Sequence, residues 1–393
     1  MSKPLVFEKP LGMRDILPES LAKQRHLEAA LKHCIERWGY EEIATPSLEY
    51  YDTVGLASAT LADRMFKLLD KQGHTVVLRP DMTTPIARVV SSLYKDVSLP
   101  IRLFYQANVF RAQEKEAGRN AEFFQTGVEL IGDASVDADA EAIAIAIYCL
   151  QAANVSPIKI AIGHVDFLDG LLDEIITDPI IHEKFRRFLH DNDYVSYRHL
   201  ADTVDIGDQD RKRLHAILNL RGGKAKIAEA RELTINGKAR KAVQTIESLW
   251  QALEAYGVTE HVLLDFNLIS NLNYYTGVVF EGYAADLGSP LVTGGRYDKL
   301  LDQFGRPAPA TGFAIKMDRL MQVTAFEQGV EKKTTVIGYA ADNRERAVTM
   351  AQQLRKEGNV VITHLLVDGE TLAPFEQRGN CETIYLVAQE GNS

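Results

Sequence analysis

The sequence predicts an α+β fold: an antiparallel sheet flanked by helices, a helical insertion and a small C-terminal α/β module. Three observations predict it. Two pairs of strand-like segments, each joined by a polar loop, lie in the first third of the chain, as expected for hairpins. Apolar residues at helical spacing dominate residues 165–262. Beyond residue 331 strand-like and helix-like segments alternate, which is typical of an α/β unit.

A helix is predicted over residues 21–38, where apolar residues share one helical face and Gly39 follows as a natural C-cap. Residues 65–79 predict a hairpin, and Pro80 with Asp81 opens the next helix. Residues 102–111 and 122–131 predict a second hairpin with a charged loop between its strands. The later elements are an apolar helix over 140–152 and strands over 273–283 and 311–315.

These elements divide the chain into parts. We expect a core over residues 1–328, with the helical insertion at 165–262 inside it. Residues 331–393 are expected to form a short C-terminal α/β domain, which is at the low end of the size range for an independent domain.

Composition narrows the class of protein. The chain has 393 residues, with 46% hydrophobic and 25% charged content, as in soluble globular proteins. The N-terminus has no apolar targeting segment, so we expect a cytoplasmic protein that does not enter a membrane. The three cysteines and ten histidines show no disulfide or metal-ligand spacing, so no metal or cofactor is expected. The net charge of −10 argues against a dedicated nucleic-acid surface.

The strand over residues 122–131 carries the first candidate site. Side chains alternate between faces, so Gln125, Gly127 and Glu129 share one side. Gly127 would leave an empty notch between the carboxamide and the carboxylate, in which a small cationic or hydrogen-bonding ligand fits. The alternative is a solvated strand face with Gly127 as a bulge, and the local sequence alone favours that alternative.

Two further pairs of residues each have two possible roles. Asp81 and Thr83 at a helix start are typical capping residues, and the same carboxylate is suited to receiving an ammonium group. Arg111 and Arg119 flank a loop and are suited to binding phosphate. Because that loop carries its own acidic residues, a surface ion-pair cluster is an equal alternative.

Taken together and in order, these segments resemble the class II histidyl-tRNA synthetase core. The matching segments are Pro10–Pro18, Gly39–Glu49, Val109–Gly132, Leu268–Gly277, Gly294–Asp298 and Gly312–Arg319. The resemblance covers residues 8–325 and implies a class II aminoacyl-tRNA synthetase-like fold that associates as a dimer. It also implies a histidine-binding site. In that site Asp81, Thr83 and Gln125 would meet the amino group, and Glu129, Tyr274 and Tyr275 would line the imidazole pocket.

The same resemblance assigns Arg111 and Arg319 to ATP contacts, but other positions depart from the synthetase pattern. Ser270 stands where the synthetases have their catalytic arginine, and Asn273 replaces an aspartate. Lys316 replaces a glycine that lies close to the nucleotide; Gln113 and Ala121 replace a motif 2 glutamate and arginine. The loss of one donor to the transition state costs on the order of 3–4 kcal/mol, so we expect no catalytic activity.

A synthetase core with its amino-acid pocket and without its chemistry resembles the regulatory subunit family of ATP phosphoribosyltransferase. That family joins a short-form catalytic subunit in a hetero-octamer, is required for the first step of histidine biosynthesis and mediates feedback inhibition by histidine. The short tail also argues against tRNA binding. Two alternatives stay open: an active histidine–tRNA ligase, and a synthetase-like module that serves another partner.

Overall fold

The protein is described here from a computed structural model. The structure describes residues 7–60, 62–112, 120–269, 275–285, 287–325, 333–367, 370–377 and 381–386. The chain divides into two compact units, Met1–Phe326 and Glu327–Ser393. Each unit has its own sheet and its own core, so each is described by itself.

One large mixed sheet organises the first unit, and within the described residues it has nine strands in the order β1-β5-β6-β12-β11-β10-β7-β9-β8. The strands are β1 (Glu41–Glu42), β5 (Ile101–Phe110), β6 (Glu122–Ile131), β7 (Ile158–His164), β8 (Arg221–Gly222), β9 (Val262–Asp265), β10 (Val278–Ala284), β11 (Val292–Arg296) and β12 (Ala310–Lys316). From β5 to β7 every neighbouring pair is antiparallel. Among the described strands of this sheet, the parallel pairs are β1–β5 and β7–β9, towards its two edges. The predicted α+β class is confirmed.

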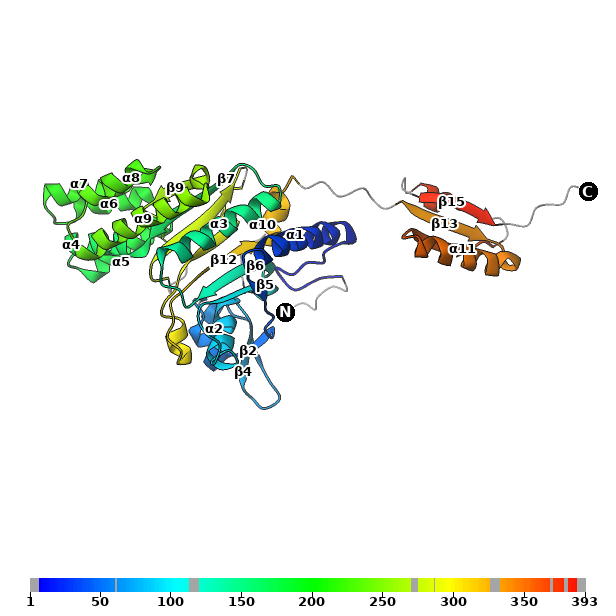
Figure 1. Ribbon diagram of the computed structural model, residues 1–393. Coiled ribbons are helices and arrows are strands. Elements are labelled where there is room, and N and C mark those ends of the chain that lie inside the picture. The colour runs from blue at the N-terminus through cyan, green and yellow to red at the C-terminus, as the bar shows by residue number, and fades with distance from the viewer. Residues whose placement is uncertain are drawn as a thin grey trace, which may run out of the picture. The chain divides into compact units, whose positions relative to one another are not determined.

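Helices cover one face of this sheet and bury the main core. They are α1 (Pro18–Glu36), α3 (Val136–Ala152), α9 (Gly237–Tyr256) and α10 (Met317–Val323), and Figure 1 shows α3 lying across the strands. Helix α3 is apolar nearly all round, with Ile143, Ile145 and Ile147 fully buried, because it lies between the sheet and its neighbours α1 and α9. Gly39 ends the first helical segment with a φ of +78°, which glycine adopts without strain.

The opposite face carries α2 (Thr83–Ser92) and a second core. Helix α2 buries Ile86 and Val90, and Met82 just before it, against strand residues such as Leu103. Below it lies a three-stranded antiparallel sheet in the order β2-β4-β3 (Figure 1). Its strands are β2 (Leu48–Tyr50), β3 (Lys67–Leu69) and β4 (Thr75–Leu78), and β3 and β4 form the predicted first hairpin. Because α2 covers only part of the sheet face, the neighbouring part stays accessible.

A helical segment separates β7 from β9. It contains α4 (Val165–Ile175), α5 (Pro179–His190), α6 (Tyr194–Thr203), α7 (Asp208–Ile217), α8 (Ala225–Glu232) and α9. Helices α4 to α7 enclose a separate apolar cluster that includes Phe185 and Tyr197. Within this segment Arg221 and Gly222 pair with β9 as the edge strand β8.

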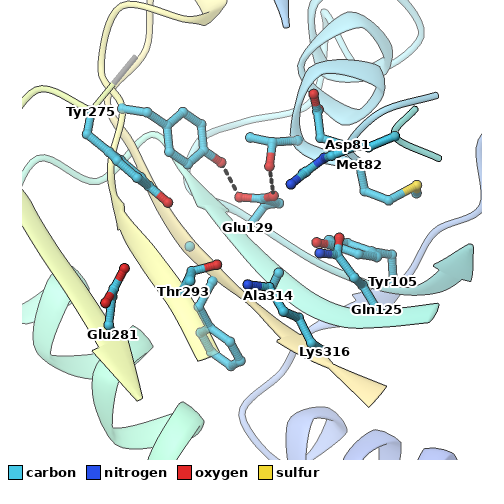
Figure 2. Close-up of a pocket in the computed structure, with 15 residues that line it drawn as sticks. Asp81, Met82, Tyr105, Gln125, Glu129, Tyr275, Glu281, Thr293, Ala314 and Lys316 are labelled. Atoms are coloured by element: carbon cyan, nitrogen blue, oxygen red, sulfur yellow. Dashed lines mark hydrogen bonds between the residues drawn. The ribbon is translucent and has the colours of Figure 1, made fainter. Parts of the chain in front are cut away.

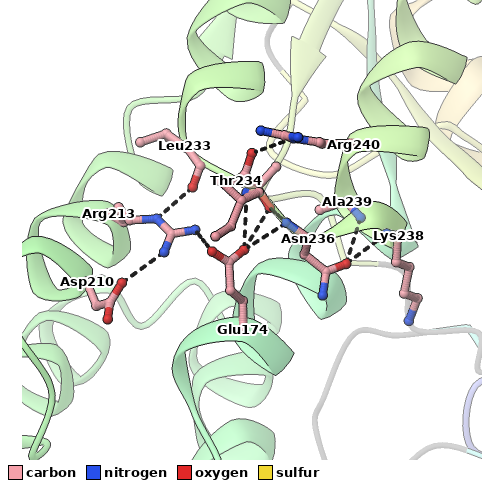
Figure 3. A network of polar contacts seen from close by, with 10 residues as sticks. Glu174, Asp210, Arg213, Leu233, Thr234, Asn236, Lys238, Ala239 and Arg240 are labelled. Atoms are coloured by element: carbon pink, nitrogen blue, oxygen red, sulfur yellow. Dashed lines mark hydrogen bonds and ion pairs between the residues drawn. The ribbon is translucent and has the colours of Figure 1, made fainter.

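A network of polar contacts connects the helices of this segment to one another (Figure 3). Glu174 of α4 accepts hydrogen bonds from Arg213 Nη2 at 2.7 Å, from Thr234 Oγ1 at 3.0 Å and from the Asn236 backbone N–H at 3.1 Å. Arg213 also donates to Asp210 at 2.8 Å. One carboxylate thereby ties α4 to α7 and to the turn that starts α9.

The second unit is a small parallel α/β sheet in the order β14-β13-β15. Its elements are β13 (Thr334–Tyr339), α11 (Arg344–Lys356), β14 (Val360–Leu365), α12 (Ala373–Glu376) and β15 (Cys381–Leu386). Helix α11 packs Ala347 and Ala351 on Ile337 and Val361. In neither unit does a described helix combine the length and the apolar character that crossing a membrane requires.

Candidate functional site

A pocket opens on the part of the large sheet that α2 leaves uncovered. It holds about 770 Å³ of space, its open mouth included. The lining residues come from α2, β5, β6, β10, β11, β12 and the segments next to them (Figure 2). They are Asp81, Met82, Thr83, Tyr105, Arg111, Gln125, Glu129, Tyr275, Glu281, Thr293, Tyr297, Gly312, Phe313, Ala314 and Lys316.

Glycines form the floor of this pocket. Glu129 of β6 lies opposite Gly312 of β12, and Gly312 lies opposite Gly295 of β11. A methyl group on Gly312 would collide with the Glu129 carboxylate, and one on Gly295 would lie 2.9 Å from the Tyr275 ring. The missing side chains therefore provide the room that Glu129 and Tyr275 occupy above the sheet.

The notch predicted at Gly127 is not empty. Tyr105 lies opposite Gly127 on β5, and its hydroxyl oxygen lies 2.5 Å from where a Gly127 side chain would begin. Gly127 is also not a bulge, because the β5–β6 pairing runs through it without interruption. The prediction of an empty notch was wrong because the side chain that fills it comes from the neighbouring strand.

Glu129 is the most deeply buried acid of the pocket, with 2% of its surface exposed. Thr83 Oγ1 donates a hydrogen bond to it at 2.7 Å, and the Tyr297 hydroxyl donates to its other oxygen. Burial raises the pKa of Glu129 to about 8, because these neutral hydroxyls offset only part of the cost of removing its charge from water. At neutral pH this carboxyl therefore mostly holds its proton.

Asp81 has two roles at the pocket wall. Its Oδ1 accepts a hydrogen bond from the Thr84 backbone N–H at 2.8 Å, as a capping residue at the start of α2 would. Its Oδ2 accepts a hydrogen bond from Ser58, a residue that the sequence did not single out. The carboxylate also lines the pocket, so capping and exposure to a ligand coexist at this position.

Cationic side chains lie at the other end of the pocket. Arg111 donates from Nε to the Pro80 carbonyl at 2.9 Å, and its guanidinium lies 5.3 Å from the Phe123 ring centre. Lys316 lies opposite Gln125 in the β6–β12 pairing. Burial, together with the positive charges of Arg319 and Arg111, lowers the pKa of Lys316 to about 8. Arg319 donates to the Pro290 carbonyl and does not line the pocket.

The structure brings most of the predicted site residues together. Asp81, Thr83, Gln125, Glu129, Tyr275 and Arg111 all line this pocket, and Arg319 lies outside it. Arg119 and Tyr274 lie outside the described residues, as do Ser270, Asn273 and Gln113. The described residues contain no group of three His, Cys, Asp or Glu side chains that could hold a metal ion.

Several pocket residues were missed by sequence reasoning. Tyr105 and Tyr297 reach the pocket from strand β5 and from the end of β11, and Glu281 and Thr293 come from β10 and β11. The one available signal for Tyr297 was the segment Gly294–Asp298, whose glycines allow close packing at the sheet. The other residues depend on strand register, which no local motif encodes.

Comparison with known proteins places this chain and its fold in a family. The histidyl-tRNA synthetase family profile matches residues 12–320. A protein from Halalkalibacterium halodurans described as "ATP phosphoribosyltransferase regulatory subunit" is 47% identical over 394 residues, covering 100% of this chain and 98% of its own length. A protein of the same description from Bacillus subtilis is 44% identical and covers 91% of each chain.

Solved structures agree with the sequence relatives. The crystal structure of an ATP phosphoribosyltransferase regulatory subunit/histidyl-tRNA synthetase from Bacillus halodurans superposes with a TM-score of 0.91 at 44% identity. It covers 99% of this chain and 100% of its own. A histidyl-tRNA synthetase from Nostoc shares the fold, with a TM-score of 0.80 at 20% identity, and covers 97% of this chain and 92% of its own. The chain therefore belongs to the family of ATP phosphoribosyltransferase regulatory subunits, non-catalytic proteins built on the histidyl-tRNA synthetase fold.

Proposed function

We propose that this protein is the histidine-sensing subunit that a short-form catalytic subunit of ATP phosphoribosyltransferase requires for activity. In this proposal the two chains assemble as a hetero-octamer in the cytoplasm, and histidine bound to this chain inhibits the partner. Residues 1–328 form the histidine-binding core, which also self-associates as a dimer. The insertion at 165–262 and the short domain at 331–393 are attached parts of that assembly.

The observation that carries the proposal is the polarity of the pocket. Glu129 with its two hydroxyl neighbours lies at one end, and the Tyr275 ring lies over Gly295 beside it. Such a site suits an imidazole, whose ring N–H donates and whose face packs on an aromatic ring. Asp81 and Gln125 offer oxygen acceptors to an ammonium group. Histidine carries these two groups and a carboxylate.

The protonation of Glu129 fits a ligand that brings positive charge. Because the pKa of Glu129 is raised to about 8, a cation that binds beside it favours release of its proton. A bound imidazolium or ammonium would then pair with a buried carboxylate, which is a strong, charge-assisted interaction. A ligand with a neutral apolar side chain of the same size could not form this ion pair with Glu129.

A mixing experiment tests the function. This chain is combined with the short-form catalytic subunit from the same source, with and without histidine. We expect activity only on mixing, and inhibition as histidine is added. Glu129→Ala should assemble and activate normally while losing inhibition, because it removes a ligand contact. Glu41→Ala, the same change at an exposed position of β1, is the control and should behave as wild type.

Two outcomes would contradict the proposal. A folded partner that stays inactive on mixing would remove the activating role. Normal inhibition of the Glu129→Ala complex would place the histidine site elsewhere.

The alternative is a histidine–tRNA ligase, which the presence of Arg111 in the pocket favours. Histidine-dependent exchange of pyrophosphate into ATP is the assay that separates the two. We expect no exchange, because Lys316 extends into the space beside Thr293 and Ala314 (Figure 2). Exchange at a rate typical of synthetases would establish the ligase.

A further inference from the structure

Lys316 is a cation with no ion-pair partner among the described residues, although the more distant carboxylates of Glu281 and Asp318 act on its charge. Among the described residues its ammonium forms no hydrogen bond and no ion pair within 4 Å. It is nevertheless half-buried on the pocket face of β12. Removing a charged group from water without a partner costs free energy, so the folded chain maintains an unfavourable charge at this position.

Arg111 adds a second positive charge to the same end of the pocket. Its described contacts are a backbone carbonyl and the face of an aromatic ring, and neither neutralises it. Both cations are near enough for Arg111 to lower the pKa of Lys316. Two positive charges that repel each other and face one cavity form an incomplete site for an anion.

The acidic and cationic ends of the pocket lie at different levels of the β6–β12 strand pair. Glu129 is level with Gly312 and Gln125 is level with Lys316, four residues further along β12. At roughly 3.3 Å per residue the backbone separation is about 13 Å. The Lys316 side chain runs back along the sheet towards Thr293 and so shortens this span (Figure 2).

We infer that Lys316 and Arg111 form an anion subsite that receives the carboxylate of the amino acid whose side chain lies at Glu129. The inference rests on the proposed function, since it assigns the remaining group of the same ligand. Ser270 carries no charge that could bind the carboxylate of the ligand. In this arrangement Lys316 provides that positive charge instead.

A carboxylate suits the subsite better than a polyphosphate. Glu281 lines the same pocket, and its negative charge acts to raise the pKa of Lys316. A single negative charge can pair with the two cations at little cost from Glu281. The several negative charges of a nucleotide triphosphate would be repelled by that carboxylate and would have to share the space that the lysine side chain already fills.

A cycle of two ligands and two proteins tests this inference by calorimetry on the full chain. The ligands are L-histidine and L-histidinamide, whose amide replaces the carboxylate at nearly the same size. The proteins are wild type and Lys316→Met, which keeps the length of the side chain and removes the charge. Lys299→Met makes the same change at an exposed lysine next to the pocket strand and serves as the control.

We expect the wild type to bind histidine at least about tenfold more tightly than histidinamide, as for a charge-assisted contact. Lys316→Met should weaken histidine binding about tenfold, leave histidinamide binding unchanged and so remove the preference. Lys316→Arg, which restores the charge, should restore the preference. The Met variant should fold, because it replaces an unpartnered cation with an apolar chain of similar volume; Lys316→Gln is the substitute if it does not.

Three results would overturn the inference in different ways. An undiminished preference for histidine in Lys316→Met would show that the carboxylate lies elsewhere while the pocket remains. A second result would be that inorganic phosphate binds wild type but not Lys316→Met, while both proteins bind histidine equally tightly. That result would assign the subsite to a separate anion. No histidine binding by wild type would instead refute the proposed function on which the inference rests.

Discussion

Two glutamates of the same core unit, Glu174 partly buried and Glu129 fully buried, have opposite surroundings. Glu174 in the helical insertion accepts hydrogen bonds from a guanidinium, a hydroxyl and backbone N–H groups. Burial acts to raise its pKa, but the bonds from Arg213 and Thr234 outweigh burial and hold the pKa below its ordinary value. Glu129 in the pocket has two neutral hydroxyls, and burial raises its pKa to about 8.

The difference distinguishes a structural polar group from a binding group. The charge of Glu174 is matched by Arg213, which in turn is matched by Asp210. The network is complete and leaves nothing for a ligand to supply. The pocket instead keeps an acid that holds its proton and, at a distance, two cations that form no ion pair among the described residues. A buried group whose bonding is unfinished and which faces a cavity is therefore the stronger candidate for binding.

Removal of Glu174 should give the largest effect on stability. Glu174→Ala removes the acceptor of Arg213 Nη2 and of the Ile235 and Asn236 backbone N–H groups, although Arg213 keeps its bonds to Asp210 and to the Leu233 carbonyl, and we expect a loss of roughly 3 kcal/mol in the free energy of unfolding. Urea unfolding measures it. Glu247→Ala is the control, since its ion pair with Arg231 is exposed and should cost less than about 1 kcal/mol.

Histidine affinity is the second measurement on the Glu174→Ala variant. Because Glu174 does not line the pocket, the folded Glu174→Ala protein should bind histidine as tightly as wild type. A marked loss of affinity with little loss of stability would reverse the distinction between the two glutamates.

Glu129→Gln should change how stability depends on pH. The carboxyl has a folded pKa of about 8 and an unfolded value near 4.5, so between these values the folded chain holds a proton that the unfolded chain releases. Wild-type stability contributed by this group is thus complete below about pH 4.5 and is lost as pH rises to 8, by on the order of 3 kcal/mol. The variant should lack this decline. Parallel stability curves from pH 5 to 8 would mean that Glu129 is ionised throughout.

Lys316→Met should give the smallest effect, and it has the opposite sign. Replacement of an unpartnered cation by an apolar chain should stabilise the protein by about 1 kcal/mol at pH 7. The folded pKa of Lys316 is lowered to about 8, so wild-type stability rises from pH 8 towards 10.5 as the folded chain releases the proton first. The advantage of the variant should therefore shrink over that range. A destabilised variant in thermal melts at pH 7 would mean that Lys316 has an internal partner.

Much of the fold follows from local sequence. The alternation in residues 122–131 correctly puts Gln125 and Glu129 on one face, and the loss of clear strand alternation after residue 165 correctly indicates helices. Of the strand predicted over residues 273–283, residues 273 and 274 lie outside the described residues, and β10 starts at Val278, where pairing with β7 begins. Pairing is a property of the neighbouring strands, so the segment alone does not determine where it starts.

The candidate site was less accessible to sequence reasoning for the same reason. Tyr105 and Tyr297 contact the pocket only because of strand register and the path of the chain after β11. The neighbours of Tyr105 in sequence give no sign of it, and those of Tyr297 offer only the glycines of the segment Gly294–Asp298. The wrong expectation at Gly127 has this cause as well, since a single strand cannot reveal which side chain its neighbour places above a glycine.

The glycine floor bears on how relatives of this chain should be sorted. A screen that checks only polar positions would accept any sequence that keeps Glu129, Gln125 and Lys316. One additional methyl group at Gly312 would meet the Glu129 carboxylate and the Val128 carbonyl, and would disturb the pocket without altering a single charge. A natural variant with alanine there would retain every conspicuous binding residue and still be expected to have lost its effector. Loss of effector binding can therefore arise from a substitution at a glycine, a position that has no functional group.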